Sequence, residues 1–103
     1  MVGTRDFRVD ASNAEQLRAW DGAEGEHWAD NADRYDDALA GYQEPFIAAA
    51  AVTASDSVID IGCGAGQCTR EAGRAASSGH ALGLDLSSRL VDVARRRATD
   101  EGA

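Results

Sequence analysis

Features that would assign a protein to a class at once are scarce in this sequence of 103 residues. No apolar run approaches the roughly 20 residues of a membrane-spanning helix, and the N-terminus lacks the apolar core of a signal peptide. Acidic residues outnumber basic ones by 18 to 10, and the net charge of −8 disfavours nucleic acid or an anionic membrane as a partner. We therefore expect a soluble cytoplasmic protein.

Cysteine is scarce as well, since Cys63 and Cys68 are the only two. A disulfide between them would clamp the backbone in and just after a glycine-rich turn, and nothing else indicates an oxidising compartment. As metal ligands they lack a second pair. We expect two reduced side chains that fill tight space, and no metal site.

What the sequence does contain is an apolar run that ends in a series of glycines. Residues 57–61 hold three β-branched apolar residues, and glycine follows at positions 62, 64 and 66. This pattern predicts a buried strand, a tight turn and then a helix from 67 to about 76. Glycine permits positive φ and close approach of a ligand, and the start of a helix offers free N–H groups. The turn is interpreted as a ligand-binding turn.

A second strand and helix follow. Residues 80–86 read as a strand, and Ser87 or Ser88 caps a final helix. The order strand, helix, strand, helix predicts an α/β fold with a parallel sheet and a right-handed connection. The arginines of the last helix are interpreted as a solvated helix end that suits the helix dipole; they are Arg89, Arg95, Arg96 and Arg97.

The N-terminal part reads as helical. A capping-box pattern at 12–15 predicts a helix from about 13 to 20, with breaks at Asp21-Gly22 and at Gly25. A second helix is predicted from 26 to Gly41, and Pro45 fits the first turn of a third. We expect three segments: a lead-in of residues 1–12, a helical segment of 13–53 and the α/β part of 54–103.

Aromatic residues recur at helical spacing in the second helix, with acids between them. Trp28 and Tyr35 either pack this helix onto the neighbouring α/β part or also close over the ligand site. The spacing does not separate these alternatives, and both stay open.

The glycine pattern decides between two kinds of ligand. A dinucleotide-binding turn follows G-x-G-x-x-G, but the position of the third glycine is Gln67. The pattern present is D-x-G-x-G-x-G, from Asp60 to Gly66. With the sequence Gly-Leu-Asp-Leu-Ser at 83–87, it resembles the first two motifs of class I S-adenosylmethionine-dependent methyltransferases. The region from Trp20 to Tyr35 is similar to the helical lead-in of members that act on small molecules.

The resemblance implies a Rossmann-like parallel sheet, S-adenosylmethionine as cofactor and transfer of its methyl group to a small-molecule acceptor. Asp85, at the end of the second strand, can accept the hydrogen bonds of a ribose diol. Asp60 either supports the turn or reaches the ligand's ammonium group through water. The cofactor-binding residues implied are Asp60, Gly62, Cys63, Gly64, Gly66, Gln67, Asp85 and Leu86. No catalytic base is assigned, because His27 and His80 are both expected outside the site.

Two parallel strands would leave unpaired edges on both sides of an apolar sheet. The resemblance implies further strands that complete the adenine and acceptor sites. We therefore expect an N-terminal portion, apparently truncated, that alone binds cofactor weakly and shows no turnover. The alternatives are a non-catalytic element that completes its sheet with another chain, and another nucleotide-binding α/β protein such as an oxidoreductase.

Overall fold

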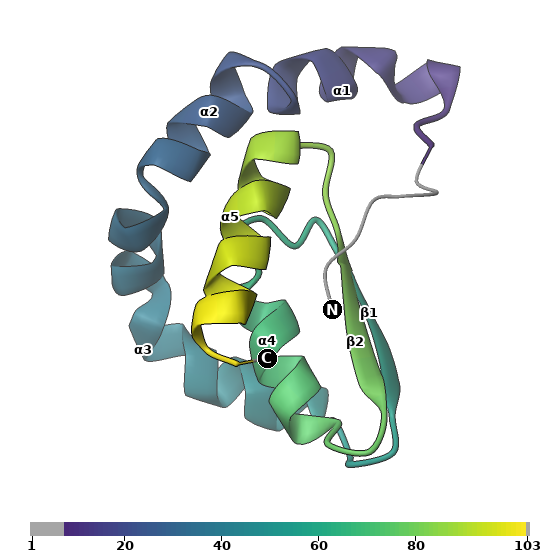
Figure 1. The fold of residues 1–103 in the computed structure, drawn as a ribbon, viewed down its shortest axis with the longest axis vertical. Helices are drawn as coiled ribbons and strands as arrows, with labels where there is room; N and C mark the ends of the chain where they lie inside the picture. Colours follow the sequence, from purple (N-terminus) through teal and green to yellow (C-terminus); the bar gives the residue numbers. More distant parts are fainter. Residues whose placement is uncertain (1–7, 103) are drawn as a thin grey trace.

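A parallel pair of strands is the framework of the fold. The structure, a computed structural model, describes residues 8–102 (Figure 1). β1 and β2 pair in parallel, with Ile59 opposite Leu82 and Ile61 opposite Leu84. The predicted order of helices followed by β-α-β-α is confirmed, and the parallel sheet with it. In chain order the elements are a 3-10 turn (Ala11–Asn13), α1 (Ala14–Trp20), α2 (Ala23–Asp30), α3 (Ala32–Ala50), β1 (Ser57–Ile61), α4 (Gln67–Ala75), β2 (His80–Leu84) and α5 (Ser88–Asp100).

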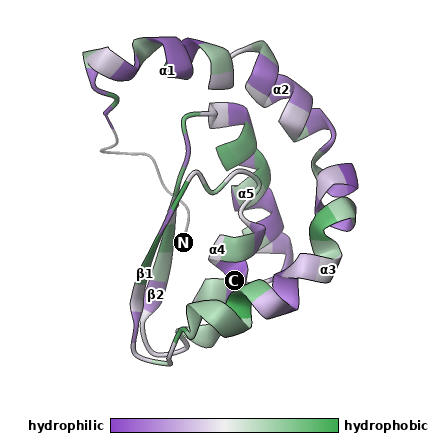
Figure 2. Ribbon diagram, turned by 180° about the vertical axis from the view of Figure 1, so that it is seen from behind, coloured by the Kyte–Doolittle hydropathy of each residue, from purple (hydrophilic) through white to green (hydrophobic). Residues whose placement is uncertain are grey.

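One face of the sheet is covered by α4 and α5, which lie on the same side of the strands in both views (Figures 1 and 2). The packing is close, since a Cβ on Gly83 of β2 would lie 2.7 Å from Thr69 Oγ1 of α4. Small residues dominate the buried core, which allows helices and strands to approach. On the other face, the side chains of Ile59 and Ile61 are exposed. The buried apolar residues are Ala32, Ala72, Ala76, Ala81, Leu90, Val91, Val93 and Ala94.

The N-terminal helices α1, α2 and α3 form an arc around α5 (Figure 1). Asp21, after α1, accepts hydrogen bonds from the backbone and hydroxyl of Ser88, at the start of α5. Gly25 of α2 is buried against Ser87, and a Cβ there would lie 2.4 Å from Ser87 Oγ and 1.8 Å from Trp20 O. The arc is therefore held by short contacts at the N-terminus of α5.

The first predicted helix, from about 13 to 20, is confirmed by α1 at Ala14–Trp20, but the start of the next helix differs. Gly25 does not break a helix: α2 begins at Ala23 and runs through it. The absence of a side chain at Gly25 permits contact with α5, so its role is in packing. At the start of α1 the Ser12 hydroxyl donates to Asp10 Oδ1, and the N-cap residue Asn13 makes no side-chain cap, so the predicted capping box is not formed. Residues 1–7 of the predicted lead-in lie outside the described residues.

The helix boundaries at Gly41 and Pro45 were wrong. The predicted second helix ends early, at Asp30, and α3 then runs through both residues. Proline lacks an N–H and its ring crowds the carbonyl four residues earlier. That residue is Gly41, where nothing lies within 4 Å of the place of a Cβ, so the helix can adjust locally. The C-terminal end of α3, residues 46–50, is hydrophobic in colour (Figure 2) and partly exposed, with Phe46 half in solvent.

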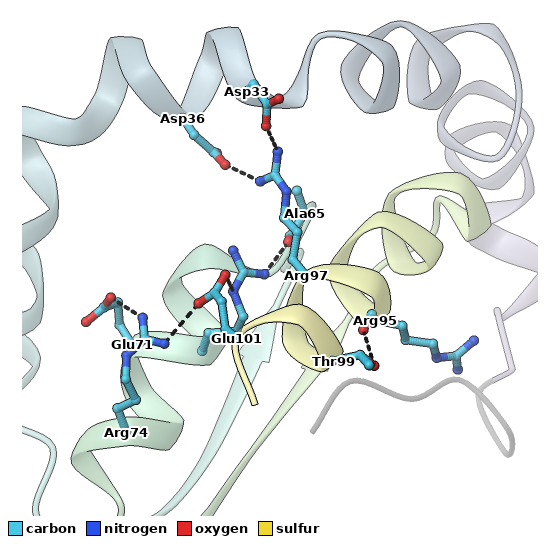
Figure 3. A network of polar contacts seen from close by, with 10 residues as sticks. Asp33, Asp36, Ala65, Glu71, Arg74, Arg95, Arg97, Thr99 and Glu101 are labelled. Carbon is cyan, nitrogen blue, oxygen red and sulfur yellow. Dashed lines mark hydrogen bonds and ion pairs between the residues drawn. The ribbon is translucent and has the colours of Figure 1, made fainter. Parts of the chain in front are cut away.

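The arginines of α5 are only partly a solvated helix end. Arg97 pairs with Asp33 and Asp36 of α3, and its side chain is 19% exposed (Figure 3). Arg89 pairs with Asp30 of α2 at 3.1 Å, in an exposed position. The dipole explanation of this cluster was therefore incomplete, because two of its members attach α2 and α3 to α5.

No helix within residues 8–102 is both long and apolar enough to cross a bilayer.

Candidate functional site

The glycine turn, residues 62–66, lies between β1 and α4 at the carboxyl end of the sheet. Its three glycines have positive φ, namely 76° at Gly62, 54° at Gly64 and 84° at Gly66. The N–H groups of Gly62 and Cys63 both donate to Leu84 O, at 2.7 and 2.9 Å, which fixes the turn against the end of β2. Nothing lies within 4 Å of a Cβ placed at Gly62 or Gly64. The backbone there is thus open to a ligand.

Asp85 joins the glycine turn to the start of α5. Its Oδ2 accepts a hydrogen bond from Gly64 N at 2.8 Å, and its Oδ1 accepts one from Ser87 N at 2.8 Å. A carboxylate has about four lone-pair sites. Two of these are used by the backbone, so each oxygen retains capacity for a further donor. The side chain is held in one orientation at the edge of the cleft described below.

Asp60 of β1 is held by a side chain of α4. Its Oδ2 accepts a hydrogen bond from Thr69 Oγ1 of α4 at 2.7 Å, and Thr69 is buried. Asp60 is not among the residues that line the cleft. The observed contact joins the end of β1 to α4.

The side chain of Arg70, in α4, supports the glycine turn through a hydrogen bond. Its side chain is 5% exposed, and Nη1 donates to Ala65 O at 2.7 Å. Nε lies 3.0 Å from Glu101 Oε2, and Arg74 donates to the other oxygen of Glu101 at 3.0 Å. Figure 3 shows this chain of contacts between the glycine turn and the end of α5. Nothing in the local sequence distinguishes Arg70 from a surface arginine of α4, so sequence analysis missed it.

The two cysteines are free thiols. Burial, together with the nearby carboxylates of Asp85 and Asp60, raises the pKa of Cys63 to about 12. A thiol with so high a pKa is a poor nucleophile at neutral pH. Cys68 Sγ lies 3.8 Å from the side-chain amide of Gln43 in α3. Residues 8–102 contain no group of three or more His, Cys, Asp or Glu that could hold a metal ion.

A cleft of about 760 Å³ lies between the glycine turn and the N-terminal helices. One side consists of the glycine turn with Gln67 and the ends of both strands. The opposite side consists of residues from α1, α2 and α3. The lining residues are Asn13, Trp20, Trp28, Ala32, Tyr35, Asp36, Leu39, Gln43, Ile61, Gly62, Cys63, Gly64, Ala65, Gly66, Gln67, Cys68, Leu84, Asp85, Leu86 and Leu90.

Three aromatic side chains form what we call the aromatic wall of the cleft: Trp20, Trp28 and Tyr35. The rings of Trp28 and Tyr35 are stacked with centroids 3.9 Å apart, and the rings of Trp20 and Trp28 are 6.5 Å apart. The sequence left open whether Trp28 and Tyr35 pack or line the site, and the structure places both in the cleft lining. Helical spacing predicted the two rings on one face of a single helix, but Trp28 lies in α2 and Tyr35 in α3, and the spacing did not indicate what the rings would meet.

Of the predicted cofactor-binding residues, all but Asp60 line the cleft. Among the two histidines, His27 has a contact that was not foreseen, because its Nε2 lies 2.8 Å from the Tyr35 hydroxyl. Its own side chain is outside the cleft lining, and His80 is exposed at the start of β2. The tertiary structure thus brings the two sequence motifs and the aromatic wall around one cavity.

Among models of protein families, the one described as a methyltransferase domain matches residues 58–103. The matched segment begins in β1 and contains the glycine turn, Asp85 and α5. No curated protein and no solved structure matches.

Proposed function

We propose, from the premise that residues 58–103 belong to a class I methyltransferase domain, that this protein uses S-adenosylmethionine and transfers its methyl group to a small molecule. The observation that carries the proposal is the cleft, because the glycine turn, Asp85 and residues of the N-terminal helices all line it. The cofactor supplies the chemistry, an electrophilic methyl group on a sulfonium, and the protein supplies binding and orientation.

The residues present fit this cofactor. A ligand can approach the backbone at Gly62 and Gly64, where no atom stands in the place of a Cβ. Asp85 is oriented by Gly64 N and Ser87 N, and its remaining lone pairs suit the two hydroxyl groups of a ribose. Leu84 and Leu86 flank Asp85 in the cleft lining and offer an apolar surface beside it. No phosphate-binding residues are required by such a ligand, and no arginine of the described part of the chain lines the cleft.

The acceptor would enter on the side of the N-terminal helices. A volume of about 760 Å³ lies within the range of roughly 300–1,000 Å³ that small-molecule sites occupy. The aromatic wall and Leu39 present apolar surface opposite the glycine turn, which excludes water and limits the orientations of a bound acceptor. These features support a small-molecule acceptor in preference to a macromolecule.

Isothermal titration of the chain with S-adenosylmethionine tests the proposal. We expect saturable binding with one site per chain, weak enough to require ligand concentrations up to the millimolar range. The Asp85→Asn variant removes the charge and one hydrogen-bond acceptor. Hydrogen bonds to a charged group contribute about 1.5–3 kcal/mol, so we expect the variant to bind roughly 10- to 100-fold more weakly.

The matched control is Asp92→Asn, which makes the same charge change at an exposed position of α5 outside the cleft lining. Its affinity should equal that of the wild type. Absence of saturable binding in the wild type would refute the proposed cofactor. Equal losses in the two variants would show that net charge, and not the position of Asp85, governs binding.

A further inference from the structure

The charged residues that line the cleft are all acidic. They are Asp36 and Asp85, and within residues 8–102 no arginine, lysine or histidine lines the cleft. Asp85 is held by two backbone N–H groups, and within residues 8–102 no arginine or histidine forms an ion pair with it. Asp36 shares Arg97 with Asp33, so one guanidinium faces two carboxylates. Each of the two lining acids therefore contributes negative charge that is not fully balanced locally.

The aromatic wall, like the two acidic residues, favours a positively charged ligand. The face of an aromatic ring carries negative potential and attracts a cation within about 6 Å of its centroid, most strongly for tryptophan. The stack between Trp28 and Tyr35 uses one face of each ring, and the second face of each is free of that contact. Trp20 is tilted by 50° to Trp28 and does not stack on it. Trp28, which contacts both other rings, is the centre of the wall.

We propose that the cleft selects an onium centre, a positively charged sulfonium or quaternary ammonium, and that Trp28 is the residue that senses this charge. The inference rests on the proposed function, because it names the chemistry that the same cleft prefers. Two sources of that chemistry exist. One is the sulfonium of the cofactor, and the other is an ammonium group on the methyl acceptor.

The first arm of the test compares S-adenosylmethionine with S-adenosylhomocysteine, which is neutral at sulfur and otherwise nearly identical. Titration calorimetry at constant ionic strength measures both affinities in the wild type and in Trp28→Leu. If Trp28 senses the sulfonium, Trp28→Leu weakens binding of the charged ligand roughly fivefold and binding of the neutral one less than twofold. The variant Trp28→Phe keeps a ring that can stack on Tyr35, and it should retain most of the preference.

The second arm uses tetramethylammonium chloride against matched sodium chloride, in the presence of S-adenosylhomocysteine. Both tryptophans of the chain line the cleft, so their fluorescence reports on its occupancy. Saturable quenching by tetramethylammonium in the wild type, with an apparent affinity that weakens in Trp28→Leu when read from the remaining Trp20, would assign the onium site to the acceptor. A charge preference confined to S-adenosylmethionine would assign it to the cofactor. Either result supports the inference.

Equal losses for the charged and neutral cofactors in Trp28→Leu, without a tetramethylammonium effect, would overturn the inference and leave the proposed function intact. That result would make the aromatic wall a simple apolar surface. If neither cofactor form binds the wild type, the proposed function fails and the inference fails with it. Thermal melting of each variant identifies a fold defect, and in that case Trp28→Phe, with its ring retained, decides between the outcomes.

Discussion

Substitution of Gly66 by alanine tests how closely the glycine turn is packed against α5. Gly66 is buried at the start of α4, with φ 84° and ψ 13°, in the left-handed region. A Cβ at this position would lie 2.8 Å from the Cβ of Ala94 and 3.0 Å from Nη1 of Arg70. Both neighbours are buried, so neither can move into solvent. The added methyl group must displace α5 or Arg70.

Two costs add in this variant. The left-handed conformation costs a residue with a Cβ about 1–2 kcal/mol. Insertion of a methyl group into a packed site costs typically about 1–3 kcal/mol more. We therefore expect Gly66→Ala to lower the free energy of unfolding by about 2–5 kcal/mol. This is a large part of the stability of a small domain, which is about 5–15 kcal/mol.

Gly64→Ala is the matched control. Gly64 also has positive φ, 54°, but nothing lies within 4 Å of the place of its Cβ. The two variants share the conformational cost and the loss of chain entropy in the unfolded state, so the difference between them isolates the contact with Ala94 and Arg70. We expect Gly64→Ala to cost only about 1–2 kcal/mol. Urea unfolding followed by circular dichroism measures both.

A second test removes the clash from the other side. Ala94→Gly deletes the methyl group that Gly66→Ala would meet, although it costs about 1 kcal/mol of helix propensity itself. The double variant should lose less free energy of unfolding than the sum of the losses of the two single variants, because the contact is relieved. Additive losses, or equal losses for Gly66→Ala and Gly64→Ala, would refute the packing of the turn against α5 described above.

Three further predictions concern charged and titrating groups. Burial and nearby carboxylates raise the pKa of Cys63 from 9.0 to about 12. Between these pH values the folded thiol keeps a proton that the unfolded thiol loses, so the free energy of unfolding falls as the pH rises. Urea unfolding at a series of pH values should show a smaller fall for Cys63→Ser. Hydrogen bonds from the Ser88 hydroxyl and backbone lower the pKa of Asp21 below 3.8. Asp21→Ala should therefore lower the free energy of unfolding by about 1 kcal/mol at pH 7. Thermal melting should show this difference vanish as the pH falls below 3.8, where the carboxyl group becomes protonated. Arg97→Met removes a half-buried ion pair with α3 and should lower the free energy of unfolding by about 1–2 kcal/mol, and by less in high salt. The control Arg89→Met removes an exposed ion pair and should lower it by about 0–0.5 kcal/mol. Urea unfolding measures both.

The elements around the glycine turn could be predicted well from the sequence. β1 is found at Ser57–Ile61 as expected, and α5 is capped by Ser87, whose side chain accepts a hydrogen bond from Leu90 N. These signals are local, because alternation of apolar residues, glycines in series and a capping serine each act within a few residues. Gln67 in place of a third glycine likewise favours a turn other than a dinucleotide-binding one, which stays a prediction.

The N-terminal helices were predicted less well, and the errors share a cause. Gly25 and Gly41 were both interpreted as helix ends, since glycine is unfavourable in a helix by roughly 1 kcal/mol. In the structure Gly25 instead gives α2 room to approach Ser87, and α3 continues through Gly41 and Pro45. Tertiary contacts outweigh a propensity of this size, and nothing near these residues in the sequence reports them.

The sequence by itself determined the strand, the glycine turn and the acid at the end of the second strand, because each is specified by neighbouring residues. Only the tertiary structure decided what surrounds them. It placed Asp60 against Thr69 and outside the cleft, put Arg70 beneath the turn, and brought the aromatic wall opposite Asp85. These pairings join residues from different elements, and their partners are chosen by the packing of whole helices, which no local pattern encodes.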